Sequence, residues 1–276
     1  MTSSMLRRDF IKHAASVGAS VGVAVMLGRR PASDAGQPPE APSGPPAPDP
    51  DDGADSPPDS EQGSDSGEAE PQDETPAVPS VLRPGDSGDA VLGVQRRLGE
   101  LGYWCGTPDG HYGGLTTSAV TALQKVAGLT RDGLCGSATN RALEAGTRPR
   151  AGTHSGHVIE IHRDTQVLLV VDSGRVGTIL ATCTGSEVPY VSEGRTWSAR
   201  TTPGSYHVYY RKEGWDHGPL GDLYRPMFFN GGIAVHGSTS VPPHPASHGC
   251  CRLTIPAMDM ILARGLITMG TAVVVY

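Results

Sequence analysis

The amino-acid sequence predicts a multidomain α+β protein, in which a small three-helix domain is followed by a mostly-β domain of sandwich or barrel-like architecture. Three observations lead to this prediction. The composition changes near residues 35 and 80, which separates a leader and a polar segment from the rest of the 276 residues. Helical periodicity then runs through residues 81–146. Seven short β-type segments follow from residue 157, with one good helix among them.

Residues 1–35 are typical of an export signal. The string RRDFIK at residues 7–12 precedes a weakly hydrophobic run, Ala14–Leu27. This run is shorter than the roughly 20 residues that a membrane-spanning helix needs. The string resembles a twin-arginine signal, with an ordinary secretory signal as the alternative. Cleavage is expected after Ala35, although Arg29 and Arg30 leave retention as a membrane anchor open.

Residues 36–80 contain 12 acidic side chains and 12 prolines, with no lysine, arginine or aromatic residue. Such a segment buries too little apolar surface to fold, so we expect a disordered, extended linker. The formal net charge of −7 arises here, because the rest of the chain has 22 basic and 17 acidic side chains, an excess of five positive charges. This mildly basic part suits an anionic surface. The sequence has no helix-turn-helix, phosphate loop or aromatic-basic patch, so no nucleic-acid partner is expected.

The segment 81–146 predicts three helices that bury one apolar face each. Ser87 or Asp89 is expected to cap the first helix and Gly102 to end it. A turn is expected at residues 108–110. The expected helices cover residues 89–101, 116–126 and 138–143.

This segment resembles the peptidoglycan-binding-like domain along its whole length. The resemblance implies a module that targets the cell wall, with a structural spacer as the alternative. Cys105 and Cys135 each lie in a loop beside a glycine, and we expect a disulfide between them, because closing such a loop stabilises a tiny exported domain by about 3 kcal/mol. The matching positions include Leu82, Gly85, Gly88, Val91, Gln95, Leu98, Tyr103, Asp109, Gly110, Tyr112, Thr116, Gln124, Asp132, Gly133 and Thr139.

The domain from residue 155 to 276 is expected to contain a single helix. Thr254 can cap this helix, Pro256 suits its first turn and Gly265 can end it. Trp104 and Trp197 are expected to be core residues. The expected strands are residues 157–162, 166–172, 176–183, 204–210, 233–236, 250–253 and 271–276.

Cys250 is the candidate nucleophile of this domain. A cysteine nucleophile needs a base that takes its proton and donors for the oxyanion that develops on the attacked carbonyl. His236 ends one strand, and the loop Ser247-His248-Gly249 leads into the next. The short connection between them allows His236 to reach Cys250, and Gly249 allows the local backbone amides to point at a bound carbonyl oxygen.

These residues resemble the L,D-transpeptidase catalytic (YkuD-like) domain, whose signature is His-Gly followed by Ser/Thr-His-Gly-Cys, an apolar residue and Arg or Asn. The resemblance implies that Cys250 attacks the amide of a peptidoglycan tetrapeptide stem, that terminal D-alanine leaves, and that the acyl group passes to the side-chain amine of another stem. His236 matches the general base, oriented by the carbonyl of Gly237. Peptidoglycan stem peptides and glycan are the implied partners, and no cofactor is implied.

The same resemblance assigns roles to the neighbouring residues. His248, Gly249 and Cys250 match the oxyanion neighbourhood, and Arg252 matches a position that shapes the acyl-donor side of the pocket. Ser247 is expected to support the loop. Segments 213–217 and 223–226 are expected as a loop and lid, from which Tyr224 and Arg225 could touch the stem, with packing as the alternative.

Two departures from the family pattern each introduce a cysteine, Cys183 and Cys251. Because adjacent strand residues face opposite sides, Cys251 must face inward if Cys250 faces the cleft. We expect a buried Cys183–Cys251 disulfide, which leaves Cys250 free. The alternatives are a redox pair at 250–251, which would silence the nucleophile, and a zinc site, whose ligand spacings fit no common pattern; no metal is expected.

The predicted function is thus that of an exported transpeptidase at the cell wall, which would touch the membrane only through an uncleaved signal. A carboxypeptidase, in which water replaces the acceptor amine, uses the same residues. A wall-binding protein with a dead catalytic domain is the third possibility, and the intact set at His236, Ser247, His248, Gly249, Cys250 and Arg252 argues against it.

Overall fold

The computed structural model describes residues 81–192 and 194–276. The predicted signal and linker therefore lie outside the described residues. Within the described ranges, no helix combines the length and the apolar character that crossing a bilayer requires.

The three predicted helices of the helical module, residues 81–146, are present. They are α1 (Asp89–Glu100), α2 (Gly114–Ala127) and α3 (Ser137–Glu144). The expected side-chain cap of α1 is wrong, because the helix begins after Gly88 without one. The hydroxyl of Ser87 is instead bonded to Nδ1 of His111 at 3.0 Å. Gly102 follows the helix with a positive φ of 83°, as expected for a residue that ends it.

Gln95 of α1 fixes the loop that joins α1 to α2. Its buried amide nitrogen donates to Asp109 Oδ1 at 2.8 Å and to His111 O and Thr116 Oγ1, both at 3.0 Å. Its Oε1 accepts from the backbone N–H groups of Asp109 at 3.0 Å and Gly110 at 2.8 Å. One side chain therefore bonds five polar groups of the loop at once, and the backbone N–H groups of Asp109 and Gly110 depend on it for their acceptor.

Replacement of Gln95 by leucine is expected to lower the free energy of unfolding by about 1–3 kcal/mol, because it leaves buried donors and acceptors unpaired. The midpoint of urea unfolding of the whole chain, followed by circular dichroism, measures this loss. Arg96→Leu is the matched control, since Arg96 is the exposed neighbour on the same helix. Equal midpoints for the two variants would contradict the assignment.

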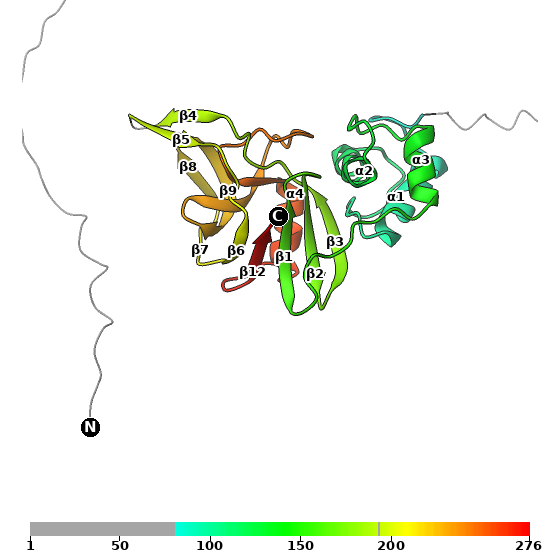
Figure 1. Cartoon of the computed structure of the whole chain (residues 1–276). Helices are drawn as coiled ribbons and strands as arrows, with labels where there is room; N and C mark the ends of the chain where they lie inside the picture. The colour runs from blue at the N-terminus through cyan, green and yellow to red at the C-terminus, as the bar shows by residue number, and fades with distance from the viewer. Residues whose placement is uncertain (1–80, 193) are drawn as a thin grey trace, which may run out of the picture. The chain divides into compact units, whose positions relative to one another are not determined.

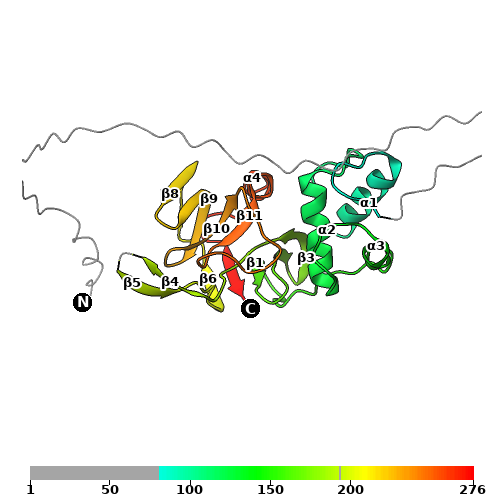
Figure 2. The ribbon, with the colours of Figure 1, turned by 90° about the horizontal axis from the view of Figure 1, so that it is seen from above.

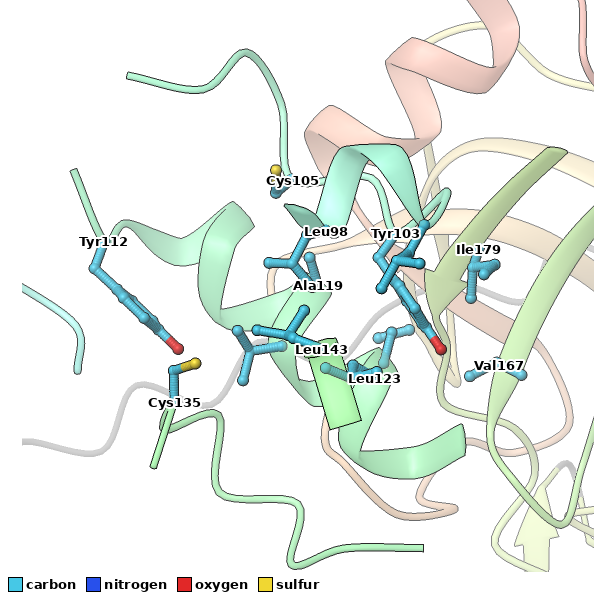
Figure 3. Close-up of a cluster of buried hydrophobic side chains, with 14 of the residues drawn as sticks. Leu98, Tyr103, Cys105, Tyr112, Ala119, Leu123, Cys135, Leu143, Val167 and Ile179 are labelled. Atoms are coloured by element: carbon cyan, nitrogen blue, oxygen red, sulfur yellow. The ribbon is translucent and has the colours of Figure 1, made fainter. Parts of the chain in front are cut away.

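The helical module shares its core with the following domain (Figure 3). Tyr103 and Leu123 belong to the same buried cluster as Val167 and Ile179. Backbone bonds join the two parts as well, since the N–H of Ile179 donates to Gly102 O at 2.8 Å and the N–H of Trp104 donates to Ile179 O at 3.3 Å. The sequence predicted two domains joined by a short connector and gave no sign of this shared core.

The second domain contains two five-stranded sheets and a separate hairpin (Figure 1). The order in the first sheet is β3-β2-β1-β12-β6, and that in the second is β11-β10-β9-β7 with β8 also paired to β9. Two pairs are parallel, β1 with β12 and β10 with β11. The strands are β1 (His157–His162), β2 (Val167–Asp172), β3 (Arg175–Ala181), β4 (Pro189–Ser192), β5 (Arg195–Ser198), β6 (Gly204–His207), β7 (Tyr210–Arg211), β8 (Trp215–Gly218), β9 (Gly221–Asn230), β10 (Ile233–Ser238), β11 (Cys251–Thr254) and β12 (Ala272–Val275).

A second buried cluster lies between these sheets and α4 (Ile255–Ala263). It joins Ile161 of the first sheet to Leu253 of the second and to Met258 of the helix. The helix is capped as predicted, because Thr254 Oγ1 accepts from the N–H of Ala257 at 3.3 Å. The prediction of a mostly-β domain with one helix is therefore confirmed.

Five strands were not predicted: β4, β5, β8 and β9, which form two hairpins, and the two-residue β7, which the predicted segment 204–210 reaches only at its first residue. The two hairpins carry many exposed side chains: β5 is exposed along its length, and β9 is exposed at its start, although Met227 and Phe229 near its end are buried. Their sequences lack the apolar alternation on which strand prediction depends. The segments 213–217 and 223–226, expected as a loop and lid, are parts of the β8–β9 hairpin instead.

Candidate active site

His236 lies on β10, and Cys250 is the residue directly before β11, which pairs with β10 in the second sheet (Figure 2). His236 of β10 is the register partner of Arg252 of β11 in a parallel pair. Alternate residues along a strand share a face, so Cys250 lies on the face that carries His236. Both side chains line the same cavity. The neighbourhood expected from the short connection between the two segments is thus present in the fold.

The imidazole of His236 is held by its own strand. Nδ1 lies 2.8 Å from the carbonyl oxygen of Gly237, which requires the proton on Nδ1 and leaves Nε2 as an acceptor. Burial lowers the pKa of His236 to about 4, the bond to Gly237 opposes this shift, and the charge of Arg252 adds to it. The ring is therefore a neutral base at neutral pH.

The thiol of Cys250 is half-buried, and Sγ lies 3.6 Å from the carbonyl oxygen of Gly232, to which it can donate. Burial raises the pKa of Cys250, while the N–H of Ala234 and the charge of Arg252 act in the opposite direction. At rest the cavity accordingly holds a neutral thiol and a neutral imidazole. A base that accepts the proton during attack is needed to generate the nucleophile.

Ser247 and Thr201 fix the loop that precedes Cys250. Ser247 Oγ donates to Cys250 O at 2.6 Å and accepts from the N–H of Gly249 at 3.0 Å. Thr201 Oγ1 donates to Gly249 O at 2.6 Å. Gly249 has φ 138°, a conformation that L residues rarely adopt. Since its N–H is engaged by Ser247, Gly249 shapes the loop and does not offer a free oxyanion donor.

The backbone N–H of Cys250 remains for that role, because it donates to no group among residues 81–192 and 194–276. His248 also faces the cavity, and its ring meets that of Tyr190 edge-on with centroids 4.6 Å apart. Ser247 and Arg252 line the cavity as well. The loop therefore presents the thiol, one free amide and a positive charge to the same space.

The cavity has a volume of about 980 Å³. Its other walls come from the two hairpins that sequence analysis missed, through Trp197 of β5, Trp215 of β8 and Asp222 of β9. Trp197, expected in the core, is 48% exposed and lines this cavity instead. The sequence offered no signal for these side chains beyond their aromatic or acidic character.

Tyr224 does not line the cavity, which is against the prediction that it touches substrate. It lies opposite Gly237 in the β9–β10 pair, and a Cβ on that glycine would meet Tyr224 Cδ1 at 2.9 Å. Its ring also packs on Trp215 with centroids 5.1 Å apart. Tyr224 is thus a support for the strand that carries His236.

Comparisons with known proteins agree with this geometry. Residues 87–143 match the putative peptidoglycan binding domain family, and residues 156–275 match the L,D-transpeptidase catalytic domain family. A crystal structure of an L,D-transpeptidase from Xylanimonas cellulosilytica is 44% identical, with a TM-score of 0.70. The similarity covers 73% of this chain and 100% of that one. The chain belongs to the L,D-transpeptidase family.

Curated relatives match over shorter stretches. The amidase CwlM of Mycobacterium tuberculosis is 45% identical over 56 residues, which are 20% of this chain and 14% of the relative. The amidase CwlL of Bacillus licheniformis is 43% identical over 68 residues, which are 24% of this chain and 19% of the relative. This L,D-transpeptidase family member thus spans less than a quarter of either amidase.

All five cysteines of this L,D-transpeptidase family member are free thiols, so the predicted disulfides are not formed. Cys105 Sγ is directed at Gln95 O, 3.4 Å away, and Cys135 Sγ at Asn140 Oδ1, 3.0 Å away. The two sulfurs lie apart in the buried cluster (Figure 3). Loops of suitable length had predicted the pair, but the chain directs each thiol to a different partner.

The geometry of β11 explains why Cys183 and Cys251 are not bonded. Cys183 pairs with Arg252 in an antiparallel bridge, so their side chains share a face. Cys251, next along the strand, faces the opposite side and is fully buried in the core beside Leu253. The inward orientation of Cys251 is therefore confirmed, and its predicted disulfide is wrong. Residues 81–192 and 194–276 contain no group of three or more side chains suited to hold a metal ion.

Proposed function

We propose that this protein forms peptide cross-links in peptidoglycan through a thioester on Cys250, with a tetrapeptide stem as acyl donor and the side-chain amine of another stem as acceptor. The observation that carries the proposal is the placement of Cys250 and His236 on one face of the β10–β11 pair and in one cavity. The bond from Nδ1 of His236 to Gly237 leaves Nε2 available for the proton of the thiol.

The chemistry has two balanced steps. In the first, the sulfur of Cys250 attacks the donor carbonyl while His236 Nε2 accepts the thiol proton. The C–N bond then breaks, the proton passes to the departing amine of D-alanine, and a thioester remains. In the second, the neutral acceptor amine attacks the thioester carbonyl and the C–S bond breaks. The proton that the amine loses passes through His236 to the departing sulfur, which restores the thiol.

The charge that develops on the donor oxygen requires a nearby donor. The free backbone N–H of Cys250 serves as one such donor. It belongs to the same residue as the attacking sulfur, so it lies close to the oxygen of the carbonyl that the sulfur attacks. Arg252 adds a positive charge on the same face of β11. His248, whose ring rests on Tyr190, forms the wall beside the donor.

The remaining parts of the chain fit an exported enzyme of the cell wall. Residues 1–35 act as the export signal, the acidic linker gives reach, and the helical module holds the catalytic domain on peptidoglycan. The match of residues 87–143 to the putative peptidoglycan binding domain family supports the last of these roles.

The proposal is tested by incubating the whole protein with disaccharide-tetrapeptides and following the products by mass spectrometry. Cross-linked dimers that have lost one D-alanine are the expected product. Tripeptides alone would identify a carboxypeptidase, in which water takes the place of the acceptor amine. Unchanged tetrapeptides would overturn the proposal and favour a wall-binding protein.

A further inference from the structure

Lys125 places a buried amino group at the contact between the helical module and the catalytic domain. It lies in the last turn of α2, which packs against β3. Its side chain is only 2% exposed, and Nζ donates to Thr182 O at 2.8 Å and to Gln166 O at 3.0 Å. Burial lowers the pKa of Lys125 to about 7, and the charge of Arg131 acts in the same direction. An apolar side chain would fill this position without the cost of desolvating an ammonium group.

The first acceptor, Gln166, is held in an unusual conformation. It is fully buried and has φ 60°, in the left-handed region that residues with a Cβ rarely adopt. Its carbonyl accepts from Lys125 and from the N–H of Thr182. Its side chain makes two hydrogen bonds to Thr184: Oε1 accepts from the backbone N–H at 2.9 Å, and Nε2 donates to Oγ1 at 2.7 Å. Lys125 thus supports a strained residue that positions Thr184.

Thr184 in turn holds the loop that carries the nucleophile. Its carbonyl accepts from the N–H groups of Ala246 and Ser247, both at 3.0 Å. Ser247 is the residue whose hydroxyl bonds Cys250 O and the N–H of Gly249. A continuous series of hydrogen bonds therefore leads from the helical module to the backbone of Cys250.

A second route starts at the other acceptor. The carbonyl of Thr182 accepts the hydrogen bond from Lys125, and its Oγ1 donates to Arg252 O at 2.9 Å. The next residue, Cys183, exchanges two backbone bonds with Arg252, at 3.0 and 3.3 Å. The two series of hydrogen bonds thus end at Cys250 and at Arg252, two residues apart on the same segment.

We propose that Lys125 is a positioning residue for Cys250, which makes the helical module part of the active-site scaffold as well as a wall-binding unit. This inference rests on the proposed function for its kinetic consequences. Its structural content is that the amino group of Lys125 sets the position of the loop 246–250 through its hydrogen bonds to Gln166 and Thr182. A residue that served stability alone would not alter the rate of the chemical step in molecules that remain folded.

The test uses the full chain with Lys125→Met, which keeps the length of the side chain and removes its charge and donors. We expect kcat for transfer to fall by about 10- to 100-fold, because small displacements of a reacting group have effects of this size, with KM within about twofold. Alkylation of Cys250 by iodoacetamide, read by peptide mass spectrometry, should slow by a similar factor. Arg148→Met is the matched control, because it removes a bond from the connector to Val176 O on β3, away from the two routes.

Thr182→Val is the second variant, since it removes only the hydroxyl bond to Arg252 and lies outside the helical module. It should reproduce the loss of kcat and the slower alkylation in molecules that circular dichroism shows to be folded. Wild-type kcat and alkylation in folded Lys125→Met would overturn the proposal. If Lys125→Met fails to fold, wild-type behaviour of Thr182→Val would overturn it instead. A wild-type protein with no activity would defeat the proposed function, and the alkylation rates would still decide the role of Lys125.

Discussion

Replacement of Cys250 by alanine is expected to abolish acyl-enzyme formation and to lower transfer by about 10⁴-fold or more, since Cys250 is the cysteine that lines the cavity and the four other thiols are buried. The measurement is the mass of the intact protein after incubation with a carbapenem, whose strained carbonyl reports the acylation step alone. The wild-type chain should gain one inhibitor, and peptide mapping should place it at residue 250. The Cys250→Ala variant should gain none.

Cys251→Ala is the matched control for this experiment. Cys251 is the adjacent thiol, but it faces the core and is fully buried. The variant should keep the adduct, with a loss of stability of about 1 kcal/mol for the small cavity that it leaves. If the adduct persists in Cys250→Ala, or disappears in Cys251→Ala, then Cys250 is not the nucleophile.

The sequence predicted the parts of this site that depend on local order along the chain. His236 lies near the end of an apolar strand, and the loop 247–249 leads directly into the next one, so their neighbourhood followed from a short connection. The inward orientation of Cys251 followed from strand alternation. These inferences needed no knowledge of distant contacts.

The parts that failed depend on contacts between distant segments. The disulfides required two thiols to converge, and the bridge between Cys183 and Arg252 turns one of them to the other face of β11. The hairpins that wall the cavity lack a strict apolar alternation, and β5 is exposed along its length, so the alternation rule could not reveal them. The buried ammonium of Lys125 is invisible in a helical pattern, because lysine on a helix is ordinarily solvated.

Replacement of His236 by glutamine is expected to lower the rate of acylation by about 10²- to 10⁴-fold, because no general base then takes the thiol proton. His244→Gln is the matched control, since His244 is exposed on the loop before the nucleophile and should leave the rate unchanged. The bond from His236 to Gly237 and the position of the ring in the cavity predict this difference between two histidines that are eight residues apart in the sequence.

The pH dependence distinguishes a neutral pair from a preformed ion pair. The pKa of His236 is lowered to about 4, so the imidazole remains a base until the pH falls through that value. The pKa of Cys250 is raised, so the thiol stays protonated throughout the neutral range. The rate of carbapenem acylation should therefore be level from neutral pH down to about 5 and should fall only below it, as the imidazole gains a proton. A thiolate–imidazolium pair would instead give reactivity toward iodoacetamide that persists below pH 4. A loss of acylation centred on the ordinary histidine pKa of about 6.5 would mean that the ring of His236 is solvated. Either result would require a different route for the proton, since the burial of His236 is what keeps the base unprotonated.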